Sequence, residues 1–323
     1  MDFVFEKLDA TDEDQFAQYY SLYSASNSND ISSPHTEREV RGRLTHESDY
    51  MNYVGLVGKS AGEMVAIAYL EIPLKDNLDK VYLTACTHPE FRNQGYGKAL
   101  LEKVEDYIRD LGRSVIWAQT TWSVDGRYRE GISFLENRGY TLDLTDAMRA
   151  LDLPWQPSDP KTNENYSLLT WRQKAPERLI DEYAKLRALI TNEAPTGDLE
   201  LENEFWDATR IRAEEKELTD LGRTISTTVA VAKDGTLAGH TQLVFDEGDE
   251  FAYQWDTLVL REHRGKGLGY SLKVQNLNET IDLLAGRTQV RTWNADVNTH
   301  MIAVNEAIGF RHLAYLGEYV KRL

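Results

Sequence analysis

A short glycine-rich motif occurs twice in this chain. Residues 92–97 read Arg-Asn-Gln-Gly-Tyr-Gly and residues 264–269 read Arg-Gly-Lys-Gly-Leu-Gly, so both follow the pattern Arg-x-x-Gly-x-Gly. Glycines let backbone N–H groups approach a ligand closely, and a helix that begins at such a turn presents partial positive charge. The motif therefore predicts a binding site for a phosphate-containing ligand in each half of the chain.

Each motif lies between a strand-like run and a helix-like run. The preceding runs are Val81–Thr87 and Tyr253–Leu260, and the following runs are Gly97–Leu111 and Gly269–Leu284. Apolar residues in the later runs recur at the spacing of one helix face. We therefore expect each motif to join the end of a strand to the start of a helix.

The surrounding elements repeat in the same order. A predicted hairpin precedes each motif strand, at 53–72 and 225–245, and Gly-aromatic pairs close both halves at 139–140 and 309–310. Such repetition indicates a duplicated domain. Pro154, Pro157 and Pro160 interrupt regular structure between the halves. We expect domains at 1–153 and 166–323, joined by a linker at 154–165.

Composition narrows the function classes. The chain has 323 residues and a net charge of −17, which disfavours unspecific nucleic-acid binding and suits a cationic small substrate. Its single cysteine, Cys86, excludes an internal disulfide and is expected to be a buried structural thiol. No secretory signal or membrane-spanning run is visible, so we expect a cytoplasmic protein without a membrane partner. The sequence leaves monomer and homodimer open.

Because of the two motifs and the repeated order of elements, each half resembles a GCN5-related N-acetyltransferase (GNAT) domain. The whole chain resembles the tandem members of that family, and its two-domain arrangement is similar to that of mycothiol synthase. The family's acyl-CoA signature is matched by Arg92, Gly95 and Gly97 and again by Arg264, Gly267 and Gly269. The resemblance implies an α/β (α+β) fold of two domains. Each is expected to hold a mixed, mostly antiparallel, twisted sheet flanked by helices.

The resemblance also implies acetyl transfer from acetyl-CoA to a primary amine by direct attack. Backbone N–H groups of the motif would hold the pyrophosphate, and an N–H near Val259 or Leu260 would polarise the thioester carbonyl. The residues expected at CoA in the second half are Leu258, Val259, Leu260, Arg264, Gly265, Lys266, Gly267, Leu268, Gly269 and Asn298. Those expected in the first half are Thr87, Arg92, Asn93, Gln94, Gly95, Tyr96 and Gly97.

Residue types favour the second half as the catalytic one. Asp256 lies on the strand before the second motif, and the equivalent position in the first half is Thr84. We expect Asp256 to act as the general base, although hydrogen bonding to a neighbouring loop is an equal alternative. Asn305 stands where the family has a tyrosine and could donate to sulfur but supplies no proton. Tyr315 is a further candidate acid, though strand tyrosines more often pack in the core.

Three other interpretations stay open at this point. The missing tyrosine keeps a non-catalytic acyl-CoA-binding or sensor protein in view, and the acceptor could also be a protein N-terminus. It is also open whether both halves carry an active site or only one does. A dinucleotide-binding βαβ protein would need G-x-G-x-x-G, which neither motif has, and no metal-ligand spacing occurs, so no metal site is expected.

Overall fold

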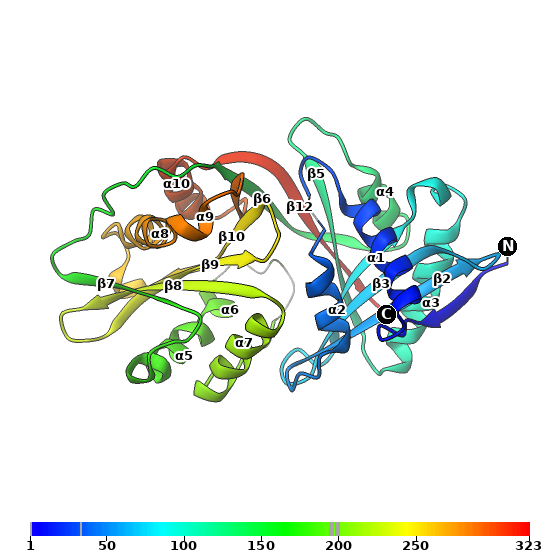
Figure 1. The fold of residues 1–323 in the computed structure, drawn as a ribbon, viewed down its shortest axis with the longest axis horizontal. Coiled ribbons are helices and arrows are strands. Elements are labelled where there is room, and N and C mark those ends of the chain that lie inside the picture. The colour runs from blue at the N-terminus through cyan, green and yellow to red at the C-terminus, as the bar shows by residue number, and fades with distance from the viewer. Residues whose placement is uncertain (1, 33, 194–196, 198–200) are drawn as a thin grey trace. The chain divides into compact units, whose positions relative to one another are not determined.

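The computed structural model describes residues 2–32, 34–193, 197 and 201–323. These residues form two compact units, one of Met1–Thr145 with Leu316–Leu323 and one of Asp146–Tyr315. Figure 1 labels their helices and strands.

The first unit is a six-strand mixed sheet with helices on both faces. Its strands follow the order β1-β2-β3-β4-β5-β12, and of the pairs described only β4–β5 is parallel. Buried residues of α1 and α2 pack on one face, and those of α3 pack on the other. Its elements are β1 (Val4–Lys7), α1 (Glu13–Asn27), α2 (Glu37–Thr45), β2 (Met51–Ser60), β3 (Glu63–Pro73), β4 (Lys80–Thr87), a 3-10 turn (Pro89–Phe91), α3 (Tyr96–Asp110), β5 (Val115–Ser123) and α4 (Glu130–Glu136).

The second unit repeats this design. Its strands follow the order β6-β11-β10-β9-β8-β7, again with one parallel pair, β10–β11. Helices α8 and α10 cover one face, and α5 and α7 cover the other (Figure 1). Its elements are β7 (Tyr166–Arg172), a 3-10 turn (Glu177–Leu179), α5 (Ile180–Ala188), α6 (Ile190–Glu193), α7 (Ala208–Asp220), β8 (Arg223–Ala232), β9 (Leu237–Asp246), β10 (Phe251–Val259), a 3-10 turn (Arg261–His263), α8 (Leu268–Glu279), α9 (Ile281–Leu284), β11 (Gln289–Ala295) and α10 (Thr299–Ile308).

The two units exchange their last strands. The strand beside β5 is β12 (Arg311–Arg322), from the far end of the chain, and the strand beside β11 is β6 (Thr141–Asp152), from the first half. Residues 146–152 pair with 289–295 in the second unit. In the first unit, Leu323 N–H donates to Ser114 C=O (2.8 Å), and Lys321 binds Glu105 (2.7 Å).

The compact units therefore differ from the division expected at 154–165. The exchange moves 146–153 into the second unit and 316–323 into the first. The proline segment is also bound along α8 rather than free of it: Trp155 Nε1 donates to Asn278 Oδ1 (2.9 Å), and Asn278 Nδ2 donates to Ser158 C=O (2.8 Å).

Local hydrogen bonding explains two shifted helix boundaries. The helix expected over Gly269–Leu284 ends at Glu279, because Thr280 Oγ1 donates back to Asn276 C=O (2.7 Å). The sequence predicts a helix over Glu204–Leu221, but α7 begins at Ala208, because Asp207 accepts from Arg210 N–H (2.8 Å) as an N-cap. No helix in the described part of the chain is long and apolar enough to span a membrane.

Candidate active site

Strands β10 and β11 separate beside the second motif. Their parallel pairing covers only Phe251–Tyr253 against residues 289–291, although both strands continue past it. At the same point β10 carries a β-bulge, seen as a register shift against β9 between Gln254 and Thr257. A bulge bends its strand away from regular pairing and is common beside active sites. The separation leaves a strand-edge gap in which an extended ligand can pair with β10.

The backbone of Val259 faces this gap. Leu260 N–H donates to Ala238 C=O (2.9 Å), and Val259 lies opposite Gly239 on β9. Hydrogen-bonded and non-hydrogen-bonded pairs alternate along an antiparallel ladder, so Val259 N–H points away from β9. Of the two oxyanion donors expected from the sequence, Leu260 is thus engaged within the sheet and Val259 is directed to the gap.

The second motif forms a tight turn into α8. Gly265 and Gly267 have φ angles of +75° and +78°, and a Cβ on either would meet no atom within 4 Å. The first backbone bond of the helix runs from Ser271 N–H to Gly267 C=O (3.1 Å), so the preceding N–H groups of the turn are available to a ligand. Glycine is needed here for its backbone conformation and leaves open space in front of those donors. This arrangement fits a pyrophosphate.

The motif arginines brace the turn against the end of its strand. Arg264 Nε donates to Val259 C=O (3.0 Å), and Arg264 Nη2 binds Glu193 (2.6 Å). In the first unit Arg92 Nε makes the equivalent bond to Thr87 C=O (3.3 Å). Both arginines therefore fix the strand carbonyl next to the ligand-facing N–H. Lys266, also in the turn, donates to the Tyr166 hydroxyl (2.9 Å).

The first motif has the same turn in different surroundings. Gly95 has a φ of +90°, and the helix bonds begin with Ala99 N–H to Gly95 C=O (3.0 Å). A Cβ on Gly97 would lie 2.8 Å from Thr87 Oγ1, so glycine allows close packing there. The remaining expected residues lie on the turn: Asn93 at a φ of +60°, Gln94 donating to Glu90 C=O (3.0 Å), and Tyr96 bonded to Ser60 (3.1 Å). Strand β4 shows no register shift against β3.

Asp256 lies beside a buried ion pair on the α5 face of the second unit. Arg187, on α5, is buried and donates two bonds to Glu214 on α7 (2.7 and 2.9 Å), with its guanidinium 4.2 Å from the Trp206 ring centre. Burial raises the pKa of Asp256; Arg187 lowers it, and Glu214 and Glu204 raise it further. A carboxylate with a raised pKa is a stronger base near neutral pH. This position suits proton removal from an amine.

A second group on this face was missed by the sequence analysis. Gln242 Nε2 donates to the Tyr183 hydroxyl (2.8 Å), and the Tyr183 ring meets His240 edge to face at 5.6 Å. His240 is fully buried, which lowers its pKa to about 3, so the ring is neutral at physiological pH. In the sequence His240 is one of several polar residues in the strand 237–246 and is not distinguished from them. The spacing of the histidines bears only on metal binding, so it gave no indication of this group.

The candidate residues near the end of the chain have defined partners. Asn298 is the N-cap of α10 and accepts from Met301 N–H (3.2 Å). Asn305 is buried, accepts from Lys273 Nζ (2.7 Å) and donates to Asn294 Oδ1 (2.6 Å). Tyr315 packs edge to face on His312 at 4.5 Å. Among the described contacts, none joins Tyr315 to Asp256 or to the glycine turn.

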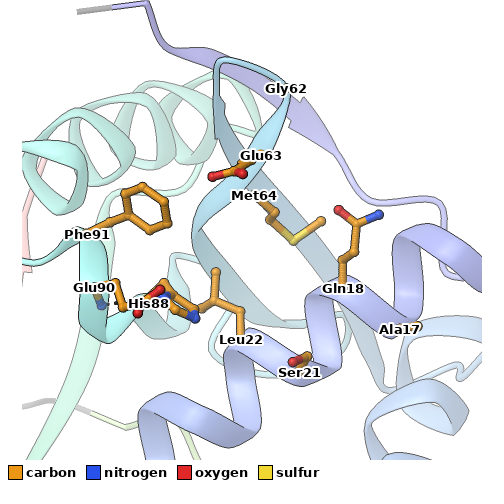
Figure 2. Close-up of a pocket in the computed structure, with 10 residues that line it drawn as sticks. All are labelled: Ala17, Gln18, Ser21, Leu22, Gly62, Glu63, Met64, His88, Glu90 and Phe91. Atoms are coloured by element: carbon orange, nitrogen blue, oxygen red, sulfur yellow. Dashed lines mark hydrogen bonds between the residues drawn. The ribbon is translucent and has the colours of Figure 1, made fainter.

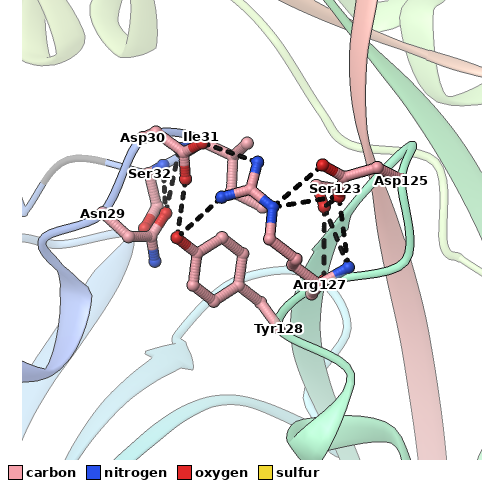
Figure 3. Close-up of polar contacts among 8 residues, drawn as sticks. All are labelled: Asn29, Asp30, Ile31, Ser32, Ser123, Asp125, Arg127 and Tyr128. Atoms are coloured by element: carbon pink, nitrogen blue, oxygen red, sulfur yellow. Dashed lines mark hydrogen bonds and ion pairs between the residues drawn. The ribbon is translucent and has the colours of Figure 1, made fainter.

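In the first unit, side chains tie the loop after α1 to the loop after β5. Arg127 binds Asp30 (2.8 Å) and Asp125 (2.9 Å), and the Tyr128 hydroxyl donates to Asp30 (2.7 Å), as Figure 3 shows. Tyr128 occupies the position that corresponds to Asn298 in the second half. On α1 itself, Ser26 Oγ donates to Thr87 C=O (3.4 Å), the carbonyl that also binds Arg92. These contacts hold α1 against the end of β4.

A hollow of about 550 Å³ lies next to this strand end, between α1 and the β2–β3 hairpin (Figure 2). Leu22, Met64 and Phe91 contribute apolar surface to it, and Glu63, His88 and Glu90 contribute polar groups. Burial raises the pKa of the nearby Cys86 thiol, which accepts from Asn27 Nδ2 (3.3 Å). The thiol is therefore a poor nucleophile.

Comparisons with known proteins show which family the two repeated halves belong to. The sequence profile of the acetyltransferase (GNAT) family matches residues 16–127 and 195–310. The chain belongs to this family. Both halves are GNAT domains, and the expected fold class is confirmed. GNAT proteins take their acyl group from acyl-CoA, so the family supports a CoA co-substrate for this chain. No curated protein sequence matches the chain.

Solved structures support the tandem arrangement. A tandem GNAT protein from the clavulanic acid biosynthesis pathway is 24% identical with a TM-score of 0.84, and the match covers 99% of this chain and 98% of that one. A GNAT protein from Sphaerobacter thermophilus is 17% identical, with a TM-score of 0.69 over 99% and 95% of the chains. N-myristoyltransferase of Saccharomyces cerevisiae, solved with myristoyl-CoA, is 11% identical, with a TM-score of 0.60 over 100% and 79%. At these identities the likeness concerns the fold.

Proposed function

We propose that this protein transfers the acetyl group of acetyl-CoA to a primary amine of a small molecule, by direct attack in a ternary complex in the second half of the chain. The observation that carries this proposal is the bulge in β10. It lies beside the strand gap and the glycine turn, on the strand whose Val259 N–H faces the gap and whose Asp256 has Arg187 and Glu214 as charged neighbours. A donor to the carbonyl and a base for the amine are thus on the same strand.

The proposed mechanism needs no covalent enzyme intermediate. Asp256 accepts a proton from the ammonium form of the acceptor, the amine nitrogen attacks the thioester carbon, and Val259 N–H stabilises the negative charge on the carbonyl oxygen. The carbon–sulfur bond then breaks and CoA leaves as the thiolate, while the attacking nitrogen loses its second proton to water as the neutral amide forms. The carboxylates of Glu204 and Glu214 near Asp256 favour an acceptor that arrives positively charged.

The first half is proposed as a scaffold that retains a CoA-type turn. Its motif strand has threonine in place of Asp256, its β4 lacks a register shift, and Asp30 binds the Tyr128 side chain that stands in the Asn298 position. The assignment of one domain each to 1–153 and 166–323 remains part of this proposal, as do the cytoplasmic location and the monomeric or homodimeric state.

Matched glycine variants test which half of the chain catalyses acetyl transfer. Acetyl-CoA is titrated by calorimetry into wild type, Gly267→Val and Gly95→Val, and free-thiol release is measured with a panel of amines that includes aminosugars, polyamines and amino acids. Both glycines have positive φ, so both variants carry similar backbone strain. We expect Gly267→Val to abolish thiol release and Gly95→Val to preserve it.

The reverse result would assign catalysis to the first half. CoA binding without thiol release from any amine would favour the sensor alternative. Release that requires a peptide N-terminus would favour a protein acceptor.

A further inference from the structure

Strand β7 is the edge of the sheet in the second unit. It is the last strand in the order β6-β11-β10-β9-β8-β7, and among the described residues its paired neighbour is β8 (Figure 1). The free N–H and C=O groups of an edge can pair with another strand, so proteins commonly shorten such edges or place charges on them. β7 has seven residues and carries no charge before its last residue, Arg172.

Strand β1, at the edge of the first unit, differs in both respects. It has four residues, and two of them, Glu6 and Lys7, are charged. Short length and charge are the features that discourage pairing at an edge. β7 is therefore the edge on which neither protection is present.

The hydrogen bonds to β8 show which backbone groups of β7 face outward. Gln173 N–H, one residue past the strand, donates to Ile225 C=O (2.8 Å) in the register of the β7–β8 pair. Hydrogen-bonded positions alternate along an antiparallel ladder, so the N–H and C=O groups of Leu168 and Thr170 point away from β8. Within the described chain no backbone or side-chain group bonds to these four groups.

Turns at the two ends of β7 each close one further outward group. Tyr166 N–H donates to Asn163 C=O (2.9 Å), and Lys174 N–H donates to Arg172 C=O (2.7 Å). The same alternation directs Tyr166 C=O and Arg172 N–H outward, where they stay open. The open acceptors are thus the C=O groups of Tyr166, Leu168 and Thr170, and the open donors are the N–H groups of Leu168, Thr170 and Arg172.

We propose that β7 pairs antiparallel with β7 of a second copy of this chain, which makes the protein a homodimer through this edge. A two-fold axis at Leu169 places Leu168 opposite Thr170 of the second copy, and Tyr166 C=O opposite Arg172 N–H of the second copy. A shift of two residues in either direction would bring Tyr166 N–H or Arg172 C=O, both already bonded, into the ladder. The centred register is therefore the one that pairs every open group.

The side chains fit the same register. Leu169 lies opposite its own copy in a non-hydrogen-bonded pair, the kind in which side chains approach most closely. Lys174 and Glu164 each lie two residues past an end of the strand, so the two-fold axis brings Lys174 of one copy near Glu164 of the other. Both side chains are exposed, and no ion pair within the described chain involves either of them. The charges at the two ends are therefore complementary.

The test measures the oligomeric state of the full chain by sedimentation over a concentration series, with circular dichroism as the check on folding. We expect wild type to be a dimer and Leu168→Pro to be a monomer, because the proline removes an outward N–H without taking a bond from β8. Lys7→Pro is the matched control on the other edge. Leu8 N–H donates to Gly55 C=O (2.9 Å), so Lys7 N–H also points outward, and this variant should remain a dimer.

Charge variants keep the test decisive if Leu168→Pro does not fold. Glu164→Lys or Lys174→Glu alone places like charges together at both ends of the paired strands and should raise the dimer Kd on the order of tenfold. The double variant exchanges the charges and should restore the Kd of wild type. A monomeric wild type would overturn the proposal and leave the edge to a strand of a different protein. A dimer whose Kd is unchanged in both single charge variants and in Leu168→Pro would also overturn it, because that dimer must use another surface.

Discussion

At the residue scale, the surroundings of Asp256 determine its pKa. The carboxylate is partly buried, and its raised pKa reflects burial first, opposed by Arg187 and reinforced by Glu214 and Glu204. Arg187 is itself held by Glu214. Two neighbours of opposite sign therefore tune the base, and each can be removed separately.

Substitutions at these neighbours should move the acid limb of the rate profile in opposite directions. A base works when deprotonated, so activity should rise with pH through the pKa of Asp256. Glu214→Gln removes a negative charge, which lowers that pKa and moves the limb to lower pH; Arg187→Met removes the positive charge and moves it to higher pH. We expect shifts of roughly half a pH unit or more in each case. The measurement is kcat/KM of acetyl transfer across pH.

Asp256→Asn is the control for this series, and it should abolish the limb. Unchanged profiles in both neighbour variants, or full activity across pH in Asp256→Asn, would remove Asp256 from the role of base.

At the element scale, the two motif strands differ in one bulge. β10 and β4 end in equivalent ways: Val259 and Thr87 each give their carbonyl to a motif arginine, and the next residue bonds back to the neighbouring strand. Only β10 shifts register against its antiparallel partner. The bulge is therefore a backbone feature by which the motif strand of the second half differs from that of the first.

Replacing Val259 with proline tests the proposed donor. Because Val259 N–H points away from β9, the substitution removes that donor without taking a hydrogen bond from the β9 ladder. We expect Val259→Pro to lose roughly a hundredfold in kcat, with little change in the circular dichroism spectrum. Thr87→Pro, at the matching position of the first unit, should keep kcat near wild type.

If both proline variants kept full kcat, the oxyanion donor would have to lie elsewhere. If both lost it with their folds intact, the first unit would share in catalysis.

The sequence predicted the glycine turns, their flanking strands and helices and the repeated order, because these depend on local periodicity and backbone conformation. It did not predict the partners of Asp256 or Asn305. Arg187 is distant in sequence from Asp256, and Lys273 is one of several polar residues in its helix. Their roles arise from which faces the sheet brings together. The bulge in β10 also carries no distinctive residue, since Trp255 and Asp256 continue an ordinary strand pattern.

At the scale of the whole molecule, the two compact units do not coincide with the two halves of the sequence. Each unit takes its last strand from the opposite half of the chain, β12 beside β5 and β6 beside β11. The sequence analysis found the repeat but not the exchange of the two closing strands. Strand pairing across such distances is decided by the assembled sheet, not by local propensity.

Fragments of the chain should show this exchange directly. A fragment of residues 1–153 lacks 316–323 and leaves the edge of β5 open, which favours association. We expect it to aggregate, whereas residues 1–145 with 316–323 attached through a flexible linker should be monomeric and cooperatively folded. Sedimentation and thermal unfolding measure the difference. A scrambled 316–323 segment is the matched control, and a stable, monomeric 1–153 fragment would contradict the expectation.

The strand exchange also has a consequence for synthesis. The first 145 residues leave the ribosome long before the eight residues that complete their sheet, with a delay on the order of ten seconds at ordinary elongation rates. During that time the edge of β5 is open to other chains. Loss of residues 316–323 would therefore damage the unit whose other residues were translated first.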